Sequence, residues 1–334
     1  WFTPAAVDPT QGLGIITRYC NNVDVIRCNP KQAQYECLGM FDNSNNTRFI
    51  DCYPEDAGRT TMQVHRGCVD SSIIRGHSRN STFLLASDEP TKGLTVHGVP
   101  GDPIINLRVV DHDVTCEGAG TGAGIDWFGE QANCSYSGRA VSDNGPAAIF
   151  YMGPGGRVYG SFVSHASGAV YAVTIRGEGS LFKDLEVSAL GCRGVNAWTL
   201  TGSNIESLNV VAADIALRLD DVENIEIVNP RVKSISGIGF ITSALIRGFL
   251  TIDNAHVDTS AERALVLDGS GDRKRTSIKN SIFRRADGTL AVNVLQTGAT
   301  FEGCKVGGVF RITNATGVVV RFNQYSEISY VGTT

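Results

Sequence analysis

The sequence lacks the features that mark several classes of protein. Its 334 residues contain no apolar run near the length of a membrane span, so no transmembrane helix is expected. Charged residues make up only 19% of the chain, and the net charge of −5 argues against nucleic acid as the main partner. Apolar residues show no 3.6-residue period over a helix length. These absences disfavour membrane-spanning, nucleic-acid-binding and mainly helical proteins.

The cysteines also lack a diagnostic pattern. Nine of them are spread from Cys20 to Cys304 without the CxxC spacing of a metal site, and the chain is long for a disulfide scaffold. Buried free thiols are therefore expected, and neither a metal nor another cofactor is expected. The chain starts at Trp1, with neither a signal peptide nor a normal translation start, and we interpret it as a fragment of a longer protein.

What the chain does contain is glycine, 38 residues of it, and a repeated short strand. Segments of β-branched or aromatic residues end in Cys, Gly or Asn at intervals of about 20–26 residues. The early examples are Val23–Cys28, Thr47–Cys52, Ser71–Gly76 and Leu94–Gly98. The late examples end at Asn229, Asn254, Asn280, Gly303 and Asn323.

The residue types in these columns suggest why the strands end there. Asn and Gly tolerate the left-handed conformation that a sharp bend requires. A chain that bends this way once per coil, with further short strands before the next bend, needs somewhat more than twenty residues per coil. The pattern therefore predicts an all-β solenoid in which successive coils pair in parallel about 4.8 Å apart. A β-sandwich with coincidental spacing is the alternative.

The column of Asn229, Asn254, Asn280 and Asn323 resembles the asparagine ladder of right-handed parallel β-helix proteins, the pectate-lyase-like superfold. The resemblance covers about residues 21–98 and 156–326, and it is closest to phage tailspikes and polysaccharide depolymerases. It implies one β-helix domain over residues 1–334, with first coils at 19–110 and later coils at 156–334. Residues 111–155, which include a glycine-rich run, are expected to form an irregular loop insertion.

Carboxylates are the main candidates for chemistry. In stacked coils, two outward carboxylates of one column lie about 5 Å apart on adjacent coils and nearly 10 Å apart when one coil is skipped. These distances bracket those of retaining and inverting glycosidases. A β-helix therefore offers both geometries.

A first cluster lies in the expected insertion and contains Asp111, His112, Asp113, Glu117, Asp126, Trp127, Glu130 and Tyr136. We expect Asp126, Glu130 and Asp113 to supply acid–base catalysis, and Trp127, Tyr136 and His112 to bind a sugar, because aromatic faces stack on sugar rings. The alternative is a solvated loop whose acids cap turns.

A second, alternative catalytic cluster is Asp51, Glu55 and Asp56, with Tyr53 and Arg59 nearby. Asp51 falls in a column with Arg27, Arg75 and His97, where alternating signs favour cross-strand charge compensation over catalysis.

A third cluster is Arg75, His77 and Arg79, near His65 and His97. A polysaccharide lyase must neutralise a uronate carboxylate and remove the proton at C5, which suits Arg with His, Lys or Tyr. No calcium-binding trio of aspartates on one strand is apparent.

The resemblance implies a polysaccharide-binding and -degrading enzyme of the tailspike type, a glycoside hydrolase or a lyase. The polysaccharide would be a capsule, O-antigen or exopolysaccharide. The protein would be located on the virion tail or in the extracellular space, and it would form a homotrimer. A non-catalytic β-helical shaft that binds glycan or spaces domains is the alternative, because fold alone does not fix function.

Overall fold

The computed structural model describes residues 14–33, 35–81, 91–118, 122–242, 245–268, 276–321 and 324–331. The chain divides into two compact units, residues 1–166 and 167–334, and each is described by itself. The described residues form strands, turns and bends without a helix, so none of them forms a helix able to cross a membrane. The expectation of a single domain stays a prediction.

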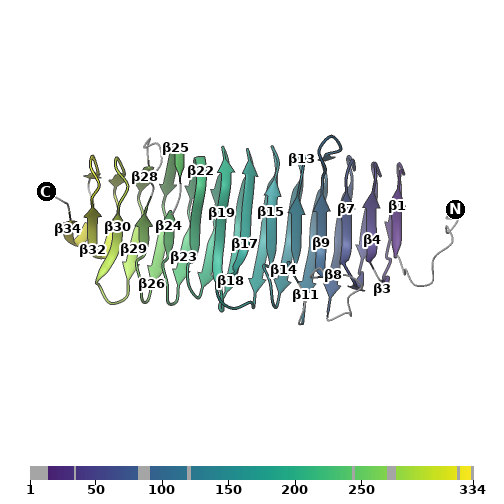
Figure 1. Cartoon of the computed structure of the whole chain (residues 1–334), viewed down its shortest axis with the longest axis horizontal. Helices are drawn as coiled ribbons and strands as arrows, with labels where there is room; N and C mark the ends of the chain where they lie inside the picture. The colour runs from purple at the N-terminus through teal and green to yellow at the C-terminus, as the bar shows by residue number, and fades with distance from the viewer. Residues whose placement is uncertain are drawn as a thin grey trace. The chain divides into compact units, whose positions relative to one another are not determined.

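The described residues of the first unit form sixteen strands. They are β1 (Ile15–Arg18), β2 (Asp24–Ile26), β3 (Lys31–Ala33), β4 (Glu36–Phe41), β5 (Arg48–Cys52), β6 (Glu55–Ala57), β7 (Thr60–His65), β8 (Ser72–Asn80), β9 (Lys92–His97), β10 (Ile104–Ile105), β11 (Arg108–Cys116), β12 (Ile125–Phe128), β13 (Gln131–Ala132), β14 (Ser135–Ser142), β15 (Ala148–Met152) and β16 (Arg157–Ser164). Within this unit the strands pair in parallel with strands of adjacent coils, as β4, β7 and β9 do (Figure 1).

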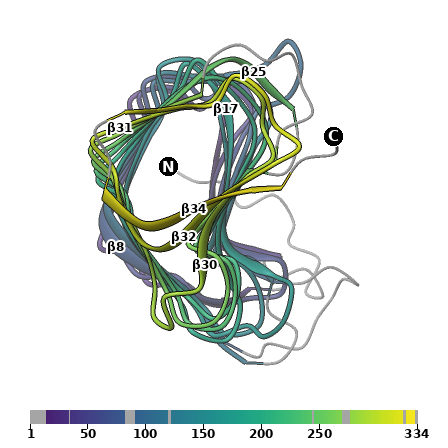
Figure 2. The ribbon, with the colours of Figure 1, turned by 90° about the vertical axis from the view of Figure 1, so that its left-hand side faces the viewer.

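The second unit continues with strands of the same kind. They are β17 (Tyr171–Glu178), β18 (Leu181–Ala189), β19 (Arg193–Thr201), β20 (Asn204–Glu206), β21 (Asn209–Ala212), β22 (Leu217–Val228), β23 (Arg231–Ser234), β24 (Phe240–Thr242), β25 (Ile246–Asp253), β26 (His256–Thr259), β27 (Leu265–Leu267), β28 (Thr276–Lys279), β29 (Ile282–Arg285), β30 (Leu290–Val294), β31 (Thr300–Glu302), β32 (Lys305–Thr313), β33 (Val319–Arg321) and β34 (Gln324–Val331). Within this unit β30, β32 and β34 lie beside one another (Figure 2).

Columns of apolar side chains form the core of each unit. In the first unit Phe49, Ile73, Val109 and Tyr136 pair in register and are each at most 1% exposed. In the second unit the equivalent column is Ile205, Ile227, Ile252, Ile278 and Phe301, all fully buried. Because side chains alternate between the two faces of a strand, the residues between these positions point outward. The parallel β-solenoid predicted from the repeat is therefore confirmed.

The predicted bends at the late asparagines are also present. Asn229, Asn254 and Asn280 have φ angles of 55°, 53° and 50°, in the left-handed region. The amide of Asn254 donates to Oδ1 of Asn229 at 2.7 Å, as a ladder requires. The amide of Asn280 instead donates to Oδ1 of Asp253 at 3.1 Å, so the ladder is continued there by a neighbouring carboxylate. Asn323 lies outside the described residues.

The register assigned to the early repeats needs two corrections. The left-handed residues there are Arg27, Asp51 and Arg75, one position before the Cys and Gly taken as the bends. Leu94–Gly98 does not continue this column, because β9 pairs with β7 and β12, whereas Ile73 pairs with Val109. The coil between them is long: Asp70 and Asn106, hydrogen-bonded across it, are 36 residues apart.

The expected irregular insertion at 111–155 is likewise corrected. Regular coils run through it, since β14 pairs with β11 and β12 with both β9 and β15. The glycine-rich run led to the wrong prediction, because Gly124 at its end is required by a close approach between coils. A Cβ at Gly124 would lie 2.5 Å from the carbonyl oxygen of Ala147.

All nine cysteines are free, as expected, and seven of them are buried. Burial raises the pKa of the Cys37 thiol to about 11 and that of Cys116 to about 12. These thiols are therefore protonated and act as small core residues.

Candidate functional site

The aromatic residues of the first predicted cluster are in the core. Trp127 and Tyr136 are fully buried and pack against Phe150, with ring centroids 6.2 and 5.5 Å from it. The indole N–H of Trp127 donates to Gln131, and the hydroxyl of Tyr136 donates to the carbonyl of His112 at 3.0 Å. The prediction that these two rings stack on a sugar is therefore wrong: alternation along β12 and β14 turns them inward.

His112 is also fully buried, so its predicted contact with substrate is wrong as well. Its Nε2 is 2.8 Å from the hydroxyl of Ser78, and burial lowers its pKa to about 3. The imidazole is therefore neutral, and it is part of the core of the first unit.

The three predicted catalytic acids do not gather in one place. Asp126 on β12 is bound by the ammonium of Lys92 at 2.5 Å, and the exposed Glu130 accepts a hydrogen bond from the N–H of Gly101 at 3.1 Å. Asp113 on β11 is in register with His77 on β8, in a different column. A catalytic role for each of them stays a prediction, but the structure does not unite them.

A cavity of about 180 Å³ lies near Asp126 and is lined by Arg59, Thr60, Gln63, Lys92, Thr95, His97 and Phe128. Beside it, burial raises the pKa of Glu36, which contacts Arg59 at 3.7 Å. Glu36 on β4 and Asp126 on β12 are three ladder steps apart and also three residues apart along the strand direction, so they are separated by more than about 14 Å. That separation exceeds the roughly 6.5–9.5 Å of an inverting glycosidase, so this pair does not fit hydrolysis.

A second cavity of about 140 Å³ unites residues of the other two clusters. It is lined by Asn29, Lys31, Tyr53, Glu55, His77 and Arg79, and we call it the His77 groove. Glu55 on β6 pairs in register with Lys31 on β3 and with Arg79 on β8. Tyr53 and His77, each two residues earlier, form the neighbouring column. Three consecutive coils thus place a phenol, an imidazole, two cations and a carboxylate in one groove.

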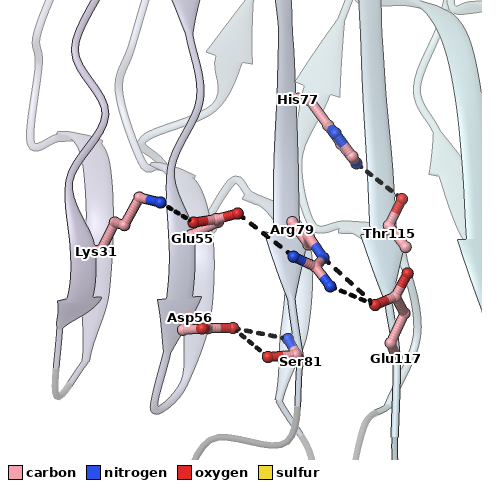
Figure 3. A network of polar contacts seen from close by, with 8 residues as sticks. All are labelled: Lys31, Glu55, Asp56, His77, Arg79, Ser81, Thr115 and Glu117. Atoms are coloured by element: carbon pink, nitrogen blue, oxygen red, sulfur yellow. Dashed lines mark hydrogen bonds and ion pairs between the residues drawn. The ribbon is translucent and has the colours of Figure 1, made fainter.

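The charged residues of the groove form a chain of ion pairs (Figure 3). Lys31 binds Glu55, whose other oxygen lies 3.5 Å from Arg79, and Arg79 binds Glu117 at 2.9 Å. The hydrogen bond from Lys31, supported by Arg79, lowers the pKa of Glu55. Glu55 is therefore ionised at neutral pH and is a poor proton donor.

His77 is the titratable group best suited to accept a proton. It is half-buried, and its Nε2 lies 2.8 Å from the hydroxyl of Thr115 (Figure 3). Burial lowers its pKa below 6.5, which outweighs the opposing effect of the Asp113 carboxylate one coil further on. The imidazole is consequently neutral at physiological pH and can act as a base.

The remaining members of the alternative cluster are structural. Asp51 binds Arg75 at 2.9 Å, which is the cross-strand charge compensation expected from the column. Asp56 accepts hydrogen bonds from the N–H and hydroxyl of Ser81, at 2.9 and 2.7 Å (Figure 3). Sequence reasoning missed Lys31, although the equal spacing of Lys31, Glu55 and Arg79 could have revealed it. Among the described residues, no three metal-ligating side chains gather into a cation site.

Comparisons with known proteins give likeness of fold alone. No protein-family model and no curated protein matches the sequence. A mannuronan C-5 epimerase A-module from Azotobacter vinelandii is 12% identical, with 92% of this chain and 91% of that chain covered and a TM-score of 0.39. The catalytic unit of an α-1,3-glucanase from Streptomyces thermodiastaticus is 11% identical, with 94% and 64% covered and a TM-score of 0.25. Both neighbours are polysaccharide-acting enzymes, but scores this low carry no argument about activity.

Proposed function

We propose that the protein degrades an acidic polysaccharide by β-elimination and that the His77 groove is its active site. The observation that carries this proposal is a neutral, half-buried imidazole set beside a phenol and two cations in one cavity. Elimination next to a uronate needs a base for the C5 proton, an acid for the departing oxygen and positive charge near the carboxylate.

The groove assigns one residue to each of these roles. His77 removes the C5 proton, and the electron pair of that bond forms the C4–C5 double bond as the C4–O bond breaks. The phenol of Tyr53, which is half exposed in the same groove, returns a proton to the departing oxygen. Arg79 and Lys31 stabilise the negative charge that develops on the uronate during proton removal.

Hydrolysis at this groove has less support. Glu55 and Glu117 both contact Arg79, and a glycosidase needs one carboxyl group that stays protonated. Because the pKa of Glu55 is lowered, the groove has the ionised carboxylate but not the acid.

The test is to incubate the protein with a panel of acidic and neutral polysaccharides while following reducing ends and the ultraviolet absorbance of unsaturated sugars. We expect both signals to rise together with an acidic glycan. His77→Ala should lower turnover by about 100-fold or more, and Tyr53→Phe should also lower it. His165→Ala is the matched control, because His165 is an exposed histidine of the same unit that contacts Asp143 at 3.0 Å outside the groove. Full activity in His77→Ala would overturn the proposal.

The second candidate is a shaft that binds glycan without cutting it. It is favoured by the ion-pair chain itself, because Lys31, Glu55, Arg79 and Glu117 already neutralise one another across stacked strands. Binding of a glycan without any new reducing ends or unsaturated product would support this function instead.

We further propose that the protein is of the tailspike type, forms a homotrimer and is located on a virion tail or outside the cell. These assignments are supported by the sequence resemblance and by nine free thiols, which suit assembly in a reducing cytoplasm. An exposed apolar side chain would be covered in such a trimer, and Val110 on β11 is partly exposed. Light scattering at micromolar concentration should give three times the mass of one chain, and a monomer would contradict the trimer.

A further inference from the structure

The second unit carries a surface that the sequence analysis did not identify. A cavity of about 490 Å³ is lined by residues of β23, β26, β29 and β32, among them Lys233, Asp258, Arg284 and Arg285. A neighbouring cavity of about 390 Å³ includes Arg231 and His256 from β23 and β26. Both open on the outward side of these strands, because the intervening Val232, Val257 and Phe283 are buried.

Strand register organises this surface into two adjacent columns. One column contains Arg231, His256, Ile282 and Lys305, and the other contains Lys233, Asp258, Arg284 and Gly307. We call the surface the Arg284 groove. Its side chains repeat at the coil spacing of about 4.8 Å, so positive charge recurs along the direction in which the coils stack.

The cations of this groove differ from those of the first unit. Arg231, Lys233, Arg284 and Lys305 are exposed, and none has an ion-pair partner among the described residues. The one acid in the two columns, Asp258, lies between Lys233 and Arg284 in register and 3.2 Å from Nε2 of His256, and Arg285 contacts Asp287 at 2.9 Å. Four positive side chains without an ion-pair partner among the described residues thus share this surface with one carboxylate, on a protein whose net charge is −5.

The groove also has space for a ligand over its last coil. Gly307 has no side chain, and a Cβ at this position would lie 3.3 Å from Cγ of Arg284, so a larger side chain would crowd the aliphatic part of Arg284. A glycine in the column of Lys233 and Arg284 leaves the face of Arg284 open.

From this arrangement we propose that the Arg284 groove binds a linear anionic glycan, one carrying carboxylates along its length. The choice of glycan rests on the proposed function and on the lining, which contains no Phe, Tyr or Trp. Proteins that hold single-stranded nucleic acid normally add such rings to their cations for base stacking. Carboxylates spaced along a glycan would meet Arg and Lys side chains on three of the four coils, those of β23, β29 and β32, where charge-assisted hydrogen bonds form.

The test measures binding in a His77→Ala background, so that turnover does not interfere. The probes are polygalacturonate, alginate and hyaluronan as anionic glycans, dextran as a neutral glycan, and oligo-thymidylate as a different polyanion. We expect at least one anionic glycan to bind with an affinity that falls as salt rises, and dextran not to bind. Lys233→Ala and Arg284→Ala together should weaken that binding by about tenfold or more.

Two variants make the test specific. Arg247→Ala with Lys279→Ala removes the same charge from the same unit outside the groove and should leave the affinity unchanged. Gly307→Glu adds a negative side chain to the groove and should abolish binding while the protein stays folded by circular dichroism. Equal losses in the groove and control variants, no anionic glycan bound, or tighter binding of oligo-thymidylate would each overturn the inference.

The outcome can be separated from that of the proposed function. If the wild type binds an anionic glycan through this groove but makes no unsaturated product, the elimination proposal fails and the binding site stands. If the wild type cuts such a glycan and the groove variants bind and cut it equally well, the binding site fails and the activity stands.

Discussion

Replacing Asn280 by Val measures what a left-handed bend contributes to the second unit. Asn280 has a φ of 50°, its backbone N–H donates to the carbonyl of Glu302 at 2.9 Å, and its side chain donates to Asp253 at 3.1 Å. A β-branched residue in this conformation costs about 1–3 kcal/mol. Loss of one exposed side-chain hydrogen bond adds about 0.5–1 kcal/mol. We expect the free energy of unfolding to fall by about 2–3 kcal/mol.

Urea unfolding followed by circular dichroism is the assay, and a loss of this size should lower the midpoint by about 1 M. Asn280→Gly separates the two terms, because glycine adopts the bend without strain and loses only the side-chain hydrogen bond. Lys279→Val is the control for β-branching, since Lys279 ends β28 with an exposed side chain. If Asn280→Val and Asn280→Gly were equally stable, backbone strain would not be the reason for asparagine in this column.

The other predictions concern buried groups and pH. Trp127→Ala should destabilise the first unit by about 3–5 kcal/mol through a cavity in the core, whereas an unchanged thermal midpoint with weaker glycan binding would restore it as a sugar platform. Because the pKa of His112 is lowered to about 3, the unfolded chain binds a proton there from pH 6.5 downward while the folded chain does not. Because of this residue, the free energy of unfolding should fall by about 1.4 kcal/mol per pH unit from pH 6.5 toward pH 3. Urea titration at each pH should show a shallower fall for His112→Gln than for the wild type. The lowered pKa of His77 should place the acid limb of the elimination rate below pH 6.5; a limb at or above 6.5 would contradict its role as the base.

The sequence predicted the positions of the bends more accurately in the second unit than in the first. The late coils differ little in length, and their Asn residues mark the bends directly, so spacing alone located Asn229, Asn254 and Asn280. In the first unit the bend positions are occupied by Arg27, Asp51 and Arg75, and arginine does not signal a left-handed conformation. The column could therefore be seen in the sequence, but its register was displaced by one residue.

What the sequence determined by itself is the repeat: short apolar strands, bend residues and an interval that favours stacked coils over a β-sandwich. It also contained the alternation of Ile125 and Trp127, both buried, although the glycine run beside them concealed the strand. Only the tertiary structure decided which residues share a column. Coil length varies, and the coil between Asp70 and Asn106 is 36 residues long. A constant interval therefore does not predict that His77 pairs in register with Asp113. Hydrogen bonding between neighbouring coils fixes that register, and it thereby sets the His77 groove and the Arg284 groove.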